Sequence, residues 1–86
     1  MKAEYQRKNW AVVDWIDSIN AGGWRDEGES FEPVTCRSIG VILKETDEYI
    51  TLAQTVGDDG KYANIVTIPK VAVTERLHAR LRNVRR

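Results

Sequence analysis

The sequence predicts an all-β domain of five strands that folds into a small, strongly bent barrel. Residues 38–52, SIGVILKETDEYITL, place two strand-like runs on either side of a charged turn, which is typical of a β-hairpin. Residues 68–73, IPKVAV, are a short apolar run broken by a proline, so one strand ends there and another begins. The 86 residues suffice for one domain with a single modest core. We therefore expect one domain over residues 1–86.

The first third of the chain predicts one strand and one long loop. Residues 1–8 favour helix but are too few to hold one without docking, so we expect a short helical turn or an arm. Residues 10–17, WAVVDWID, are rich in β-branched and aromatic residues and predict a strand with Trp10 and Trp15 in the core. Residues 18–33 contain three glycines, four acids and a proline without periodicity, which predicts an acidic surface loop.

The middle of the chain predicts the hairpin. The β pattern resumes at Val34, and Gly40 within that strand is typical of the sharp bend that a small barrel needs. One face of the strand carries Ile39, Val41 and Leu43, and the other carries Cys36 as a small buried hydrophobe. Residues 45–48 form a polar turn, and residues 49–56 run back as the third strand.

The last third predicts two further strands. Residues 57–60, GDDG, are a turn in which a positive φ is expected, and residues 63–68 follow as the fourth strand. Residues 70–72 make a single tight turn into a fifth strand over about residues 73–77. Apolar residues at helical spacing in this region leave a helix as an alternative. We expect a solvated or weakly helical basic tail over residues 78–86.

The net charge is zero, but the charges are segregated along the chain. Residues 1–8 carry three cations and one acid, residues 9–60 carry three cations and eleven acids, and residues 61–86 carry seven cations and one acid. The three segments therefore have net charges of +2, −8 and +6. The basic segment can contact phosphates locally, while the acidic middle opposes strong nonspecific binding of nucleic acid.

The composition also indicates in which cellular compartment the protein is expected. The chain has one cysteine, which cannot form an internal disulfide, and this fits a reducing environment. No run is long and apolar enough to cross a membrane, and the first residues lack the apolar core of a secretory signal. We expect a cytoplasmic protein with no membrane contact.

Catalytic and metal sites are not indicated. His78 lacks cysteine, serine or carboxylate partners at a useful spacing. Asp14 and Asp17 are three residues apart, which on a strand places them on opposite faces. The acids of residues 18–33 are typical of loop solvation, and those of residues 57–60 of turn chemistry. We expect a non-enzymatic protein without a cofactor, and a small hydrolase is the most distant alternative.

Two short motifs resemble those of Sm-like proteins, which are small SH3-type barrels. Residues 47–52, DEYITL, with Gly40 upstream, are similar to the first Sm motif, and residues 68–70, IPK, followed by Val73, are similar to the second. Together they cover about residues 36–77. A family of small uncharacterised phage and prophage proteins is still more similar, and the shared residues are Trp15, Asp17, Gly23, Trp24, residues 38–40, Glu45, Thr46 and residues 68–70. A phage origin would place the protein in the cytoplasm of a bacterial host.

The resemblance implies a nucleic-acid site and a ring. In Sm proteins an aromatic residue stacks on a base, an asparagine reads its edge and an arginine closes the sandwich. Tyr49 and Thr51 occupy the first two positions here, and Pro69 stands at the third with Lys70 beside it. The open edges of the fourth and fifth strands, residues 64–68 and 73–77, imply a homo-oligomer in which the edge of one subunit pairs with that of the next.

Two further features are candidate contacts. Trp24, in the acidic loop, is a candidate partner-binding residue, and the alternative is that it pins the loop to the barrel. Five arginines near the C-terminus form a candidate contact for nucleic acid, and the alternative is a solubilising tail; they are Arg76, Arg80, Arg82, Arg85 and Arg86.

Two functional hypotheses follow. The leading one is a self-associating Sm-like module that binds RNA or single-stranded DNA through the basic tail, Tyr49, Thr51 and Lys70. The alternative is a protein-interaction or virion-assembly module in which the loop around Trp24 contacts a protein and no nucleic acid is bound.

Overall fold

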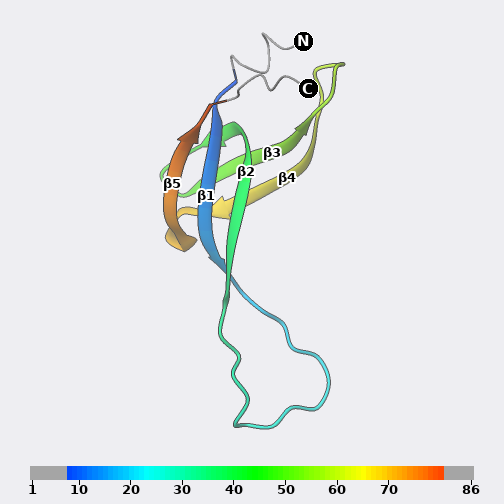
Figure 1. Cartoon of the computed structure of the whole chain (residues 1–86), viewed down its shortest axis with the longest axis vertical. Helices are drawn as coiled ribbons and strands as arrows, with labels where there is room; N and C mark the ends of the chain where they lie inside the picture. Colours follow the sequence, from blue (N-terminus) through cyan, green and yellow to red (C-terminus); the bar gives the residue numbers. More distant parts are fainter. Residues whose placement is uncertain (1–7, 81–86) are drawn as a thin grey trace, which may run out of the picture.

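Five antiparallel strands form one sheet, which confirms the predicted all-β class and strand number. The sheet is not closed, because its edge strands β4 and β5 do not pair, so the predicted barrel is not confirmed. The computed structural model describes residues 8–80, so the expected arm and most of the expected tail lie outside the described residues. The sheet order is β4-β3-β2-β1-β5, which makes β4 and β5 the two edges (Figure 1). The elements are β1 (Trp10–Asp17), β2 (Val34–Glu45), β3 (Tyr49–Val56), β4 (Tyr62–Pro69), the short 3₁₀ turn η1 (Lys70–Ala72) and β5 (Val73–Ala79).

The hairpin of β2 and β3 is closed by hydrogen bonds across its turn. The backbone N–H of Thr46 donates to the carbonyl of Tyr49 at 2.9 Å. The Thr46 hydroxyl in turn accepts from the N–H groups of Glu48 and Tyr49, at 3.1 and 3.2 Å. A polar residue that satisfies free backbone donors in this way is typical of tight turns. The turn thus fixes where β2 ends and where Tyr49 begins β3.

The second hairpin joins β3 to β4 through residues 57–60. Gly57 donates its N–H to the Lys61 carbonyl at 2.8 Å, and Asp59 accepts from the Lys61 N–H at 3.0 Å. Gly60 has φ of 82°, a left-handed conformation that glycine adopts without steric cost. The predicted positive φ in this turn is confirmed at Gly60.

The core lies on the inner face of the sheet. It consists of five fully buried residues, with four more partly buried hydrophobic side chains packed against them. The five are Ala11, Val13, Ile50, Leu52 and Ile68, and the four are Trp15, Ile42, Val66 and Val73. The prediction that Trp15 is a core residue is confirmed, because it packs against this cluster. Trp10 and Cys36 are half-buried and are not part of the cluster, so placing them in the core was wrong. The indole N–H of Trp15 donates to the hydroxyl of buried Ser38 at 3.1 Å, which satisfies the polar atom of this side chain.

Gly40 is required by a close approach of β2 and β3. A Cβ atom at this position would lie 2.5 Å from the carbonyl oxygen of Ala53 and 2.9 Å from its carbonyl carbon. The predicted glycine within the second strand therefore has a steric reason. Shortly after it, the pairing of β2 with β3 shifts register between Ile42 and Lys44, which interrupts the simple alternation of faces expected for residues 39–43.

The bounds of the long loop and of the last strand decide where several candidate site residues lie. Residues 18–33 form the predicted exposed loop, which projects away from the sheet between β1 and β2 (Figure 1). The fifth strand extends to Ala79, so His78 and Ala79 belong to β5 and not to the expected tail. Their pairing with Ala11 and Trp10 of β1 accounts for the extra length. Within residues 8–80 no helix is long or apolar enough to cross a membrane.

Candidate functional site

The predicted site residues are distributed over three places. Tyr49 and Thr51 lie on β3, Lys70 begins η1, and Arg76 lies on β5. Trp24 lies in the loop of residues 18–33, and Arg80 follows β5 with an exposed side chain. The remaining arginines of the predicted basic patch, Arg82, Arg85 and Arg86, lie outside the described residues.

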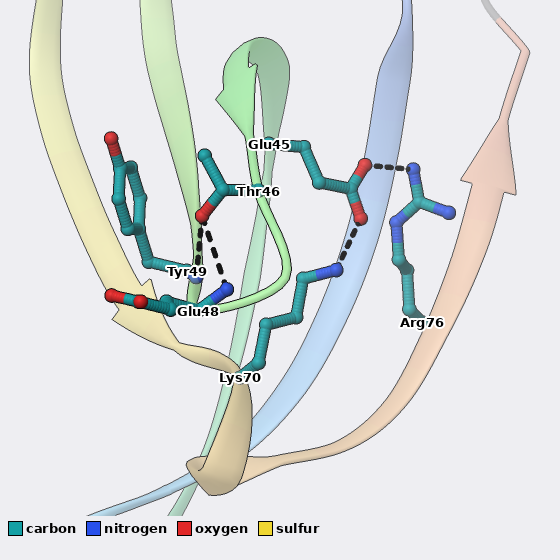
Figure 2. Close-up of polar contacts among 6 residues, drawn as sticks. All are labelled: Glu45, Thr46, Glu48, Tyr49, Lys70 and Arg76. Atoms are coloured by element: carbon teal, nitrogen blue, oxygen red, sulfur yellow. Dashed lines mark hydrogen bonds and ion pairs between the residues drawn. The ribbon is translucent and has the colours of Figure 1, made fainter.

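Lys70 and Arg76 converge on one carboxylate that was not predicted to be their partner. The Lys70 ammonium donates to Glu45 Oε2 at 2.7 Å, and an Nη2 of Arg76 donates to Glu45 Oε1 at 2.7 Å (Figure 2). The side chain of Lys70 is 31 % exposed, that of Arg76 is 30 % exposed and that of Glu45 is 27 % exposed. We call these three residues the Glu45 cluster.

The fold explains why the Glu45 cluster forms. Glu45 is the last residue of β2, and Lys70 is placed next to the same turn because its backbone N–H donates to the Glu48 carbonyl at 2.8 Å. Arg76 pairs with Val13 across β5 and β1, and Val13 is fully buried, so Arg76 lies on the inner face of the sheet. The cluster therefore links β2 to β5 and η1, elements that are not neighbours in the sheet.

The electrostatics of the cluster follow from these contacts. The hydrogen bond from Lys70 lowers the pKa of Glu45 below its ordinary value, partial burial opposes this, and the charges of Arg76, Lys70 and His78 lower it further. Glu45 is therefore ionised at neutral pH. Lys70 and Arg76 are held by an internal anion, which reduces the attraction that they exert on a phosphate.

Tyr49 and Thr51 are half-buried, and their contacts are local. The Thr51 hydroxyl is 2.8 Å from that of Thr67, its partner on β4. The Lys44 ammonium lies 5.8 Å from the centre of the Tyr49 ring, within cation–π range. Figure 2 shows the Tyr49 ring directed away from the Lys70 ammonium. The structure thus places Tyr49 and Thr51 near the β2–β3 turn. It does not bring Lys70 to the Tyr49 ring, as a site of the Sm type that holds a base between the two would require.

Trp24 is fully exposed, with a relative solvent exposure of 103 %. The alternative that it pins the loop to the sheet is therefore wrong. The turn around it is held by Arg25, whose Nε donates to the Gly22 carbonyl at 3.2 Å and whose guanidinium lies 3.6 Å from the Glu29 carboxylate. Gly23 has φ of 79°, which favours glycine beside the tryptophan.

Sequence reasoning missed Glu45 and Arg25 as organising residues. Glu45 lies 25 and 31 positions from its two partners, and no local spacing signals such a contact. Arg25 and Glu29 are four residues apart, a spacing at which opposite charges meet in a helical turn, but the surrounding loop has no helical pattern.

Within residues 8–80 no group of three or more histidine, cysteine, aspartate or glutamate side chains is arranged to hold a metal ion. No protein-family model, curated protein or solved structure matches the chain.

Proposed function

We propose that this chain is a non-enzymatic binding module whose long loop, residues 18–33, contacts a protein partner through Trp24. The full exposure of Trp24 is the observation that carries this proposal. A tryptophan offers about 150–250 Å² of surface for burial, and tryptophan is enriched among the residues that dominate binding energy at interfaces. A fully exposed tryptophan is costly in solvent, and a partner that covers it removes that cost.

The charge of the loop indicates the class of partner. Residues 18–33 carry four acids and one cation, a net charge of −3, and the cation Arg25 is engaged with Glu29. Such a loop repels phosphates and favours a protein surface with basic residues around an apolar site. Of the two hypotheses, this geometry favours the interaction module, since Glu45 already neutralises Lys70 and Arg76.

The test compares two aromatic substitutions in the same loop. Phe31 is also exposed, at 44 %, and serves as the control for Trp24. Cross-linked partners of the tagged protein would be identified and purified, and their affinity measured by calorimetry. Trp24→Ala should raise Kd by about thirtyfold or more, as for an interface hot spot, while Phe31→Ala should have a much smaller effect. Equal effects of the two substitutions would contradict the proposal.

A second candidate is the Sm-like module that binds RNA or single-stranded DNA. It is supported by Tyr49, whose half-buried ring lies close to a cation, and by the exposed Arg80. Such a module would be a closed barrel, and Lys70 or Arg76 would have to exchange Glu45 for a phosphate. An aromatic ring can stack on any base, and the arginines can contact the backbone.

Filter binding at two salt concentrations tests this candidate. Truncation from Arg80 onward removes Arg80, Arg82, Arg85 and Arg86, and should weaken binding alike for unrelated sequences. The truncation should also make the plot of log binding constant against log salt concentration less steep, by roughly 0.7 units of slope per lost phosphate contact with a single strand. Tyr49→Ala should cost about 1–3 kcal/mol of binding with little change in that slope. A folded parent protein that binds neither RNA nor single-stranded DNA would eliminate this candidate.

The Sm-like hypothesis also implies that the protein self-associates through its strand edges. The edge strands β4 and β5 each have one side without a neighbouring strand in the sheet. Asn64, on the edge strand β4, has φ of 56°, and its amide donates to the Thr55 hydroxyl at 2.8 Å. This left-handed residue distorts the start of the edge, so regular pairing between subunits would be confined to the part of β4 that follows it.

A further inference from the structure

One side chain joins the chain before Trp24 to the chain after it. The Nε of Arg25 donates to the Gly22 carbonyl at 3.2 Å, and its Nη1 lies 3.6 Å from a carboxylate oxygen of Glu29. Arg25 thus spans the segment on both sides of the exposed tryptophan. We call residues 22–29 the loop tip.

A turn and a glycine add to the order of the loop tip. The backbone N–H of Glu29 donates to the Asp26 carbonyl at 3.1 Å, which closes a turn directly after Arg25. Gly23, directly before Trp24, has φ of 79°, a conformation in which other residues are strained. The backbone is therefore defined on both sides of Trp24, while the Trp24 side chain itself is fully exposed.

The contacts of Arg25 lie within the loop and not against the sheet. The loop projects away from the strands, and Arg25 reaches only residues of the loop tip (Figure 1). The side chains of Arg25 and Glu29 are 51 % and 41 % exposed, and ion pairs this open to solvent contribute little to the stability of a fold. The contacts therefore order the loop tip locally and leave the stability of the sheet unchanged.

The charge of Arg25 opposes the attraction that the rest of the loop provides. Residues 18–33 contain four acids and one cation, so the loss of Arg25 would change their net charge from −3 to −4. Long-range attraction to a basic partner would increase as a result. The electrostatic effect of Arg25 on binding and its effect on the order of the loop tip therefore have opposite signs, and an experiment can separate them.

We propose that Arg25 is a positioning residue for the partner contact, which holds the loop tip so that Trp24 is presented before the partner arrives. The inference rests on the proposed function of Trp24 and adds how that contact is prepared. A segment that is ordered in advance loses less conformational entropy on binding, and such ordering mainly slows dissociation. Arg25 thus slows dissociation from the partner, although its charge also slows association with a basic surface.

NMR relaxation of the free protein tests the order of the loop tip. The backbone amide of Trp24 should have an order parameter above about 0.6 in the parent, and Arg25→Gln should lower it into the flexible range below that value. The Tm should not change, because the sheet does not depend on Arg25. Glu27→Gln is the matched control: Glu27 is exposed in the same turn, and its loss leaves the contacts of Arg25 in place.

Binding kinetics test the positioning role. The probe is the partner protein purified after cross-linking to the tagged parent, immobilised for surface plasmon resonance. Arg25→Gln should raise Kd by about three- to tenfold through faster dissociation, although the loop becomes more acidic. Glu27→Gln should instead slow association and leave dissociation unchanged. Arg25→Lys keeps the charge but lacks the planar fork that reaches two acceptors, so its dissociation rate should lie between those of the parent and Arg25→Gln.

Two outcomes would overturn the inference. The first is an order parameter of Trp24 that is already in the flexible range in the parent or stays unchanged in Arg25→Gln. The second is a Kd for Arg25→Gln that equals or falls below that of the parent. If Trp24→Ala weakens binding and Arg25→Gln does not, the proposed function stands without this inference. If no partner of the parent is captured, or if Trp24→Ala leaves its binding unchanged, both fail.

Discussion

Replacing Glu45 with glutamine should destabilise the fold and make its stability less dependent on acid. Glu45 accepts one hydrogen bond from Lys70 and one from Arg76, each 2.7 Å long. Glutamine keeps the shape of the side chain and one acceptor oxygen but loses the charge. The Nε of Arg76 is already buried without a hydrogen-bond partner, so this arginine depends on Glu45 for compensation.

The expected magnitude follows from the burial of the cluster. Fully exposed ion pairs contribute about 0–1 kcal/mol each. All three side chains of the Glu45 cluster are less than a third exposed, so its two pairs should lie towards the upper end of that range. We expect Glu45→Gln to lower the free energy of unfolding by about 1–2 kcal/mol at neutral pH. For a domain of this size, a loss of about 1.5 kcal/mol lowers Tm by about 6–12 °C.

The pH dependence has a definite sign. The folded-state pKa of Glu45 is lowered below its ordinary value of 4.5. The stabilisation is therefore fully present above the unfolded pKa and is lost as pH falls through the folded pKa. The difference in Tm between the parent and Glu45→Gln should be constant near neutral pH. It should begin to shrink near pH 4.5 and vanish once Glu45 is protonated in the folded state.

Thermal unfolding followed by circular dichroism at several pH values measures this difference. Glu48→Gln is the matched control, because Glu48 lies in the same turn and its exposed carboxylate takes no part in the cluster (Figure 2). The reasoning would be refuted if both variants melted alike at neutral pH. It would also be refuted if the deficit of Glu45→Gln persisted undiminished in acid.

Three other substitutions have defined outcomes. Arg37 donates two hydrogen bonds to Asp14, at 2.7 and 2.9 Å, and thereby lowers the pKa of Asp14. Arg37→Gln should raise the pKa of Asp14 towards its ordinary value of 3.8 in an NMR titration. An unchanged pKa would contradict the ion pair. Gly40→Ala should destabilise the fold by about 1–3 kcal/mol in urea, since its Cβ would meet the β3 backbone at 2.5 Å, whereas Gly28→Ala has open space and should be neutral. Thr46→Val removes the acceptor of two turn N–H groups and should cost about 1 kcal/mol in the same assay; no loss would show that water replaces the hydroxyl.

The strands were predictable because their signals are local. Alternating β-branched and apolar residues located β1, β2 and β3, and the glycine-rich and proline-containing breaks located the turns between them. The end of β5 was misplaced by two residues, since its last part is held by pairing with β1 and not by its own sequence pattern. The fourth strand also begins one residue earlier than predicted, at Tyr62.

The candidate site was predictable in part. The exposure of Trp24 could be expected from a glycine-rich, acidic loop with no apolar periodicity. The ion pairs of Lys70 and Arg76 with Glu45 could not be expected from the sequence. A count of basic residues does not show which lysines and arginines are already neutralised by an acid of the same chain. Likewise, residues 12, 39 and 77 are far apart in the chain, and they become neighbours on one face of the sheet because β1 pairs with both β2 and β5.

The sequence by itself determined the all-β class, the order and approximate bounds of the strands, the turns and the exposed loop. These depend on side-chain size, branching and backbone preference within a few residues. The tertiary structure decided which charges are paired and which apolar side chains stay uncovered. Those outcomes depend on the sheet order β4-β3-β2-β1-β5, which brings together Glu45 and Arg76 across an intervening strand and places Val12 between Ile39 and Leu77. Contacts of this kind join residues tens of positions apart, and no local pattern encodes them.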